Sequence, residues 1–256
     1  MTKLGPQYLL SLDDDVLCGA RPLAEHDVRS LDRGLKSDAN QHLYNAILTI
    51  HDALCGVING FYSWSIVKAY YASFYCVQAY NELAGVCIFY VGKKPFICYA
   101  KAGRLIERAR FPSDVRGSHQ IARELFKREF PDNFFLSQEI DGKNAIEWQQ
   151  GWREEVNYRA RSFAEPNVPI CLQQCSRLGT RKTINLYFGD DGYQYEFDPF
   201  HAMLALPMRL FRQTIKEFQV NLEEIIDGER KRFLNNTLRD KGGPVQIVPI
   251  LERFLA

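Results

Sequence analysis

The stretch from Ser65 to Ala79 constrains the fold of this chain more than any other, because its bulky and small residues recur at helical spacing. The bulky residues stand three and four positions apart, on one face of a helix: Val67, Tyr70, Tyr71, Phe74 and Gln78. The small residues between them allow close approach of a neighbouring helix: Ala69, Ala72, Ser73 and Cys76. A helix rich in tyrosine suits the middle of a bundle, where each phenol hydroxyl finds a partner. Taken alone, the pattern predicts an aromatic core helix.

Two later stretches give this helix a context. One predicted helix opens at Gly117-Ser118-His119, and another carries Arg153, Asn157 and Tyr158 near its end. The order of a Tyr-Tyr-Ala helix, a short His-led helix and a helix with Arg-x-x-x-(Asn/Asp)-Tyr resembles the HEPN superfamily, over about residues 40–165. Members of that superfamily are small helical bundles of prokaryotic toxin–antitoxin and antiviral systems. The resemblance implies an antiparallel helical bundle.

The composition fits a folded protein without metal or cofactor. At 256 residues and 46% hydrophobic, the chain can bury a full core, and its net charge of +1 indicates neither nucleic acid nor an anionic membrane as a partner. The first residues lack an apolar signal segment and no apolar run could span a bilayer, so we expect a cytoplasmic protein with reduced thiols. Cys171 and Cys175 are the one close cysteine pair, and no further ligands stand at zinc spacing.

The first half of the chain predicts two long antiparallel helices after an irregular start. Residues 1–37 mix charges with helix breakers, and we expect short helical pieces there. A long helix is predicted from Ala39 to Asn59, with Asp38 as its cap and Gly60 as its stop. The Tyr-Tyr-Ala helix then runs from about Tyr62 to Leu83, and the short connection makes the two helices antiparallel neighbours.

The middle of the chain predicts a hairpin and three further helices. Residues Val86–Tyr99 are β-rich around a Gly-Lys-Lys-Pro turn, which indicates a small hairpin. Lys101–Arg110 is predicted as a short basic helix, the helix led by His119 ends at Pro131, and Lys143–Phe163 is predicted as a third long helix.

The last part of the chain predicts a second hairpin and a long helix. After a loop over residues 164–180, the strands Thr183–Phe188 and Tyr193–Phe197 surround a Gly-Asp-Asp-Gly turn. Asp198 as cap and Pro199 at the first position then predict the start of a long helix. The fold class is therefore mainly α, with a lead-in (1–37), a HEPN-like antiparallel bundle with hairpin insertions (38–165), and a hairpin plus long C-terminal helix (166–256).

Apolar residues along the predicted C-terminal helix alternate four and three apart, which is a heptad seam: Leu204, Met208, Phe211, Ile215, Phe218, Leu222 and Ile225. The stripe is narrow and its flanks are charged. We therefore predict that the seam contacts a protein partner or a second copy of the chain. Packing of the seam on the protein's own bundle is the alternative.

The candidate catalytic residues are Arg153, Asn157 and Tyr158. The HEPN resemblance implies a ribonuclease motif in which an Arg is followed four to six residues later by a His, acting across a dimer without metal. Such an enzyme needs a base for the 2′-hydroxyl proton and a cation for the phosphate. Asparagine cannot accept a proton at neutral pH, so the motif is degenerate here. Arg21 and His26 match the spacing elsewhere, outside the predicted bundle.

Basic residues after the first hairpin are candidates for contacts with nucleic acid. Arg104 and Arg108 are four apart on the predicted helix, and Arg116 and His119 follow closely. A helix start also favours phosphate binding. The alternative is a solvated helix face.

These features support three hypotheses of function. The first is a HEPN-like accessory or regulatory subunit of a prokaryotic, antiviral multi-protein complex, without catalysis of its own. The second is a HEPN-type ribonuclease toxin acting as a dimer. The third is a nucleic-acid-binding module.

Overall fold

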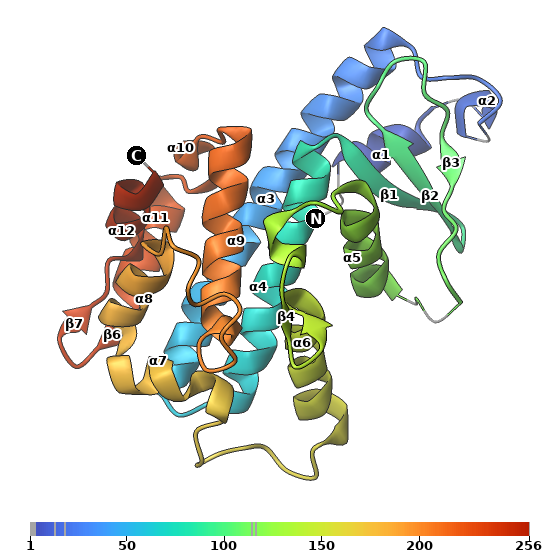
Figure 1. The fold of residues 1–256 in the computed structure, drawn as a ribbon. Helices are drawn as coiled ribbons and strands as arrows, with labels where there is room; N and C mark the ends of the chain where they lie inside the picture. The colour runs from blue at the N-terminus through green and yellow to red at the C-terminus, as the bar shows by residue number, and fades with distance from the viewer. Residues whose placement is uncertain (1–3, 13, 18, 114, 116, 256) are drawn as a thin grey trace. The chain divides into compact units, whose positions relative to one another are not determined.

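The computed structural model in Figure 1 describes residues 4–12, 14–17, 19–113, 115 and 117–255. Most of these residues lie in helices and the strands form small antiparallel sheets, which confirms the predicted mainly α class with small hairpins. The chain divides into two compact units. The first unit joins Met1–His42 to Val77–Phe130, and the second joins Leu43–Cys76 to Pro131–Ala256. These bounds differ from the predicted division at residues 37 and 165, because each unit is built from two separate stretches.

A small antiparallel sheet forms the centre of the first unit. Strand β1 (Val86–Val91) pairs with β2 (Lys94–Tyr99) in the predicted hairpin, and β3 (Glu107–Arg108) pairs with the other edge of β2. Side chains alternate between the two faces of the sheet. One face packs on residues of α1 (Leu4–Leu10) and of the first part of α3 (Glu25–Ile58), and the opposite face packs on α5 (Gly117–Glu129).

Helix α3 begins at Glu25, well before the predicted start at Ala39. Asp38 does not cap it. Its carboxylate instead accepts hydrogen bonds from the backbone N–H groups of Leu4 and Gly5, both at 2.8 Å, and so caps α1. The sequence shows that an Asp can cap a helix, but it does not show which helix N-terminus its carboxylate contacts in the fold. The cap prediction was therefore wrong, and a short α2 (Asp14–Leu17) completes the start of the chain.

The predicted basic helix over Lys101–Arg110 is absent, and a loop followed by β3 takes its place. Two backbone hydrogen bonds of 3.0 Å explain the difference, since Leu23 N donates to Arg104 O and Gly103 N donates to Leu23 O. Gly103 has a φ of 80°, which a glycine adopts readily. The backbone hydrogen bonds with Leu23, which is distant in sequence, therefore outweigh the weak helical pattern of residues 101–110.

In the second unit the end of α3 lies antiparallel to α4 (Tyr62–Leu83), with the bounds of α4 as predicted. Gly60 ends α3 with a φ of 78°. Gly56 lets the two helices approach closely, because a Cβ atom there would collide with Ser65 Oγ. Lys68 Nζ also donates to Asp52 Oδ2 at 3.0 Å. The predicted antiparallel pair is therefore confirmed.

The rest of the second unit is helical, apart from two short hairpins. In chain order its elements are the 3₁₀ turn Phe134–Leu136, β4 (Glu139–Ile140), β5 (Lys143–Asn144), α6 (Ala145–Glu154), a π-helix (Glu155–Arg159), the 3₁₀ turn Ile170–Leu172, α7 (Gln173–Leu178), α8 (Thr180–Phe188), α9 (Ala202–Phe218), α10 (Leu222–Ile225), α11 (Gly228–Thr237), β6 (Arg239–Asp240), β7 (Gly243–Pro244) and α12 (Ile247–Leu255).

The predicted second hairpin is wrong, because Thr180–Phe188 forms α8 and residues 193–197 form no strand. Ile184, Tyr187 and Phe188 are three and four apart and all buried, so they give α8 one apolar face that packs on α9. The predicted loop over residues 164–180 likewise contains α7. Short apolar runs fit a strand or a helix equally well, and burial on a neighbouring helix decided between them.

Helix α9 is buried on almost every side, so the chain itself covers the predicted seam. Leu204, Met208, Phe211 and Ile215 are all buried, and α6, α8 and α12 pack on α9. Gln219, with a φ of 51°, ends the helix, so Leu222 and Ile225 belong to α10 and Phe218 is the last residue of α9. The prediction of a continuous partner-binding seam is therefore wrong.

Two arginines of α9, Arg209 and Arg212, are buried together with the seam residues. The guanidinium of Arg209 lies 4.2 Å from the centre of the Tyr193 ring, and its Nε lies 3.6 Å from the Glu196 carboxyl group. Arg212 donates to Phe254 O at 3.0 Å and pairs with Asp191 at 2.7 Å. The carboxyl oxygens of Glu196 have no hydrogen-bond partner within the described chain. Burial is the main cause that raises the pKa of Glu196 to about 7.

Phe211→Ala is expected to lower the free energy of unfolding by about 3–5 kcal/mol, because it removes a fully buried ring that packs edge-on against Phe188. Urea denaturation followed by circular dichroism measures the loss. Phe200→Ala serves as the control, since Phe200 is 41% exposed and its removal should cost less than about 0.5 kcal/mol. Equal losses in the two variants would show that α9 is not the core of its unit.

Glu196→Gln is expected to flatten the pH dependence of stability. The folded-state pKa of about 7 lies above the ordinary value of 4.5, so the folded chain holds this proton more tightly. The stability that Glu196 contributes is therefore complete below pH 4.5 and is lost as the pH rises through 7. Between pH 4.5 and pH 7, the free energy of unfolding of the variant should therefore rise by about 3 kcal/mol relative to that of the parent. Urea midpoints across this range test it, with exposed Glu223→Gln as control. Parallel profiles for parent and Glu196→Gln would contradict the assignment.

Candidate functional site

The Arg-x-x-x-Asn-Tyr motif lies where α6 changes into a π-helix. The Asn144 side chain caps α6 by accepting from Glu147 N at 3.0 Å. After Glu154 the helix widens, and Ala160 N donates to Glu155 O at 2.8 Å, five residues back. The predicted helix to Phe163 therefore ends at Arg159. Single π turns are frequent at functional sites, and this one carries Asn157 and Tyr158.

Arg153 lies against three tyrosine rings. Its guanidinium carbon is 5.8 Å from the centre of the Tyr70 ring, 5.9 Å from that of Tyr71 and 5.2 Å from that of Tyr158. Tyr158 follows Arg153 by five residues. Residues five apart lie on the same side of a π turn, whereas in an α-helix they point in different directions. Arg153 Nε is buried and makes no hydrogen bond to any described residue. The arginine is thus held by the three rings and by a side-chain hydrogen bond with Tyr71, and the Tyr158 ring is exposed.

The two histidines of the second unit are engaged away from Arg153. Tyr187 and the Nδ1 atom of His201 are 2.8 Å apart. Nε2 of His51 lies 2.8 Å from the Thr237 hydroxyl, and its Nδ1 lies 3.3 Å from Asp52. Within the described part of this unit, no imidazole contacts Arg153. A proton acceptor suited to a metal-free ribonuclease is therefore missing beside Arg153 in this unit.

The second match to the ribonuclease spacing has a structural role. Arg21 and His26 both face the buried carboxylate of Asp27, at 4.0 Å and 3.2 Å. Asp27 also accepts from Ala24 N at 2.9 Å and from the Tyr8 hydroxyl at 3.1 Å, which ties the start of α3 to α1. The two candidates therefore share a carboxylate partner, which competes with a phosphate for them.

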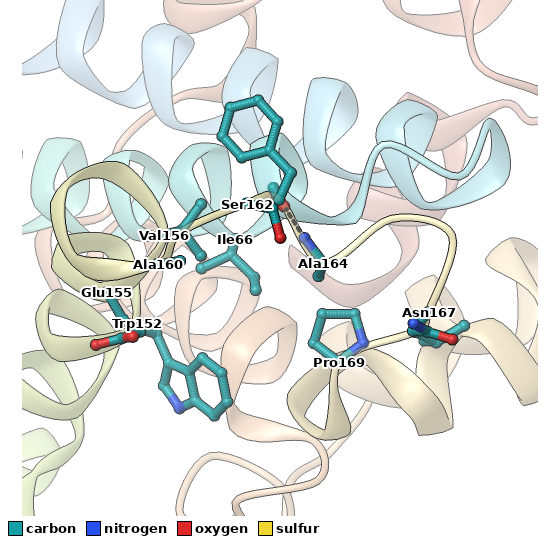
Figure 2. Close-up of a pocket in the computed structure, with 12 residues that line it drawn as sticks. Ile66, Trp152, Glu155, Val156, Ala160, Ser162, Ala164, Asn167 and Pro169 are labelled. Atoms are coloured by element: carbon teal, nitrogen blue, oxygen red, sulfur yellow. Dashed lines mark hydrogen bonds between the residues drawn. The ribbon is translucent and has the colours of Figure 1, made fainter.

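The start of α4 is capped by a residue far away in the sequence. Glu165 accepts hydrogen bonds from Ser63 N at 2.8 Å and Ser63 Oγ at 2.7 Å, so its charge lies at the positive end of the helix. Partial burial alone would raise the pKa of Glu165, but the hydrogen bonds from Ser63 outweigh it and lower the pKa. Ser63 Oγ also accepts from Ala164 N at 3.0 Å, drawn as a dashed line in Figure 2. These bonds hold the loop after the π-helix against α4.

A pocket of about 350 Å³ lies between that loop, the π-helix and α4. Figure 2 shows the indole of Trp152 and the ring of Pro169 on opposite sides of it, with Ile66 and Val156 also lining it. The lining is mainly apolar. Sequence analysis did not find this pocket, because its walls come from stretches that are far apart in the chain.

Exposed aromatic side chains surround the same segment. Trp64 and Phe163 are each more than half exposed, and their rings meet edge-on at 6.0 Å. Trp64 lies seven residues before Tyr71, on the same face of α4. We call Trp64, Tyr71, Arg153, Tyr158 and Phe163 the aromatic surface. The seven-residue spacing of Trp64 and Tyr71 is the sequence signal that could have extended the Tyr-Tyr pattern toward the N-terminus.

The structure separates the predicted nucleic-acid residues. Arg104 is in a loop with its guanidinium 4.7 Å from the centre of the Tyr99 ring, Arg108 is in β3, and His119 is half-buried in the first turn of α5. Arg116 lies outside the described residues. The expectation that Arg104 and Arg108 share a helix face was wrong, since that helix does not form.

Comparisons with models of protein families, with curated proteins and with solved structures found no match to this chain. Among the described residues, no helix is both long and apolar enough to cross a membrane. In the same part of the chain, no three His, Cys, Asp or Glu side chains are grouped to hold a metal ion. Cys171 and Cys175 are buried, and burial raises the pKa of their thiols to about 12 and about 11.

The purified protein is expected not to cleave RNA, because Asn157 stands where a base is needed and the histidines of its unit are engaged elsewhere. Incubation with total RNA and with single-stranded oligonucleotides, followed by gel electrophoresis, tests this. Arg159→Ala is the matched control for Arg153→Ala, since Arg159 is an exposed arginine on the same segment. Cleavage that disappears in Arg153→Ala and persists in Arg159→Ala would contradict the expectation.

Proposed function

We propose that this chain is a HEPN-like accessory subunit of a prokaryotic multi-protein complex, of the antiviral type that the resemblance implies. In this proposal it binds a protein partner through the aromatic surface and has no catalysis of its own. The observation that carries it is the exposure of Trp64, Tyr158 and Phe163 around an arginine that stacks on tyrosines.

The composition of the aromatic surface suits a binding site for protein. Trp, Tyr and Arg are the residues that most often dominate the binding energy of protein interfaces. They combine a large contact area with few rotatable bonds, so they lose little entropy on binding. Exposed aromatic clusters of this kind are uncommon on surfaces that only face water.

The surface is also rigid, which favours specific binding. Trp64 and Tyr71 project from one helix, and Glu165 ties the loop that carries Phe163 to the first turn of that helix. Stacking holds Arg153 and Tyr158 together on the π turn. A partner that docks here would not have to order the surface first.

The double variant Trp64→Ala with Phe163→Ala is expected to weaken partner binding more than about tenfold, because it removes two exposed anchors and leaves the core intact. Tagged protein co-expressed with the products of neighbouring genes, then analysed by size exclusion and calorimetry, measures the effect. Phe200→Ala with Phe233→Ala removes two exposed rings elsewhere in the unit and is the control.

Three results would decide against the proposal as stated. A partner that binds both double variants equally well would exclude the aromatic surface as its site. Failure of every neighbouring gene product to bind would remove the accessory-subunit role. A homodimer of the parent that the Trp64 and Phe163 changes dissociate would make the partner a second copy of this chain.

A further inference from the structure

Positive charge is concentrated in one part of the first unit. Residues 93–128 hold ten Lys and Arg against three Asp and Glu, a net of +7, whereas the whole chain has a net charge of +1. The rest of the chain is therefore acidic on balance. A segregated basic region creates a local positive potential that the overall charge conceals.

Apart from Arg116, which lies outside the described residues, the basic residues of this stretch fall into two groups. Those on α5 are paired with neighbours, as Arg123 and Lys127 pair with Glu124 and Arg128 pairs with Glu129. Six others are exposed, and none has a carboxylate within ion-pair distance in the described chain: Lys93, Lys94, Lys101, Arg104, Arg108 and Arg110. These six lie on the hairpin, the loop after it and β3. Their charge is available to an anionic partner.

The pairing of the strands places three of these cations on one face of the sheet. Arg108 stands opposite Phe96 across β2 and β3. Ala109 N donates to Pro95 O at 2.9 Å, so the pairing continues and Arg110 stands opposite Lys94. Lys94 and Phe96 are two residues apart on one strand and therefore share a face. Lys94, Arg108 and Arg110 therefore share one face of the sheet with Phe96, and we call these four residues the cationic face.

The outer half of this face is open. Toward α1 and α3 it is buried through Cys87, Phe89 and Cys98, but Lys94, Arg108 and Arg110 are exposed and Phe96 is half-buried. The Phe96 ring stacks on Phe89 at 5.8 Å, which fixes its orientation. Unpaired cations beside an aromatic side chain are the two features that proteins combine to bind single-stranded nucleic acid.

We propose that the cationic face binds single-stranded nucleic acid, with Lys94, Arg108 and Arg110 on phosphates and Phe96 under a base. Arginine binds phosphate oxygens through two parallel hydrogen bonds. Residues two apart on a strand are about 7 Å apart, close to the spacing of successive phosphates in an extended strand. A duplex fits less well, because its bases are stacked on one another and cannot reach the ring.

The test is fluorescence anisotropy with labelled oligo(U) and oligo(dT), titrated between about 50 and 200 mM salt. The triple variant Lys94→Gln, Arg108→Gln, Arg110→Gln should weaken binding at least tenfold. It should also reduce the slope of log K against log salt by about 2, since each lost phosphate contact on a single strand accounts for about 0.7. The control Arg177→Gln, Lys182→Gln, Arg239→Gln removes the same charge from exposed positions of the second unit and should change neither quantity.

A second variant separates stacking from charge. Phe96→Leu keeps an apolar side chain against Phe89, so it should weaken binding several-fold without changing the salt slope. Thermal melts of all variants should match the parent. The proposal is overturned if the parent does not bind at micromolar concentration in low salt, or if the two triple variants weaken binding equally. Tighter binding to duplex, or to anionic phosphatidylserine vesicles than to either oligonucleotide, would also overturn it.

Discussion

The burial of α9 with two charged side chains is the constraint on which the second unit depends. A buried arginine is tolerated only when it is paired or stacked, and Arg209 and Arg212, three residues apart, need partners on the same side of the helix. The stretch between α8 and α9 supplies them through Tyr193, Asp191 and Glu196. That stretch therefore packs against α9 instead of pairing as a hairpin. The packing of α6, α8 and α12 on α9 removes the predicted seam from the surface.

The candidate site depends on one extra residue in a helical turn. In an uninterrupted α-helix Arg153 and Tyr158 would point in different directions, whereas the π turn brings the Tyr158 ring to 5.2 Å from the guanidinium. The turn also redirects the following chain so that Glu165 reaches the first turn of α4. The Arg-x-x-x-Asn-Tyr motif resembles a degenerate ribonuclease motif in the sequence. In the structure, its arginine lies against tyrosine rings within the aromatic surface.

The two proposed binding surfaces differ in the interactions they offer. The aromatic surface presents rings and one stacked arginine, which suits a desolvated protein contact. The cationic face presents unpaired Lys and Arg around one ring, which suits a charged and hydrated partner. Because the two surfaces belong to different units of the chain, variants of one should leave the other intact.

Local patterns in the sequence were sufficient for the elements whose stability is local: the glycine stop of α3 at Gly60, the tyrosine-rich α4, the β1–β2 hairpin and the mainly α class. Periodicity and turn residues act over a few positions and can be counted along the chain. They could not show that Asp38 caps α1, that Glu165 caps α4, or that residues 183–188 are helical. Each of those outcomes depends on a contact with a residue that is distant in sequence. A carboxylate can cap any nearby helix, and a short apolar run can pack as a helix or as a strand, so only the tertiary contacts decide which occurs.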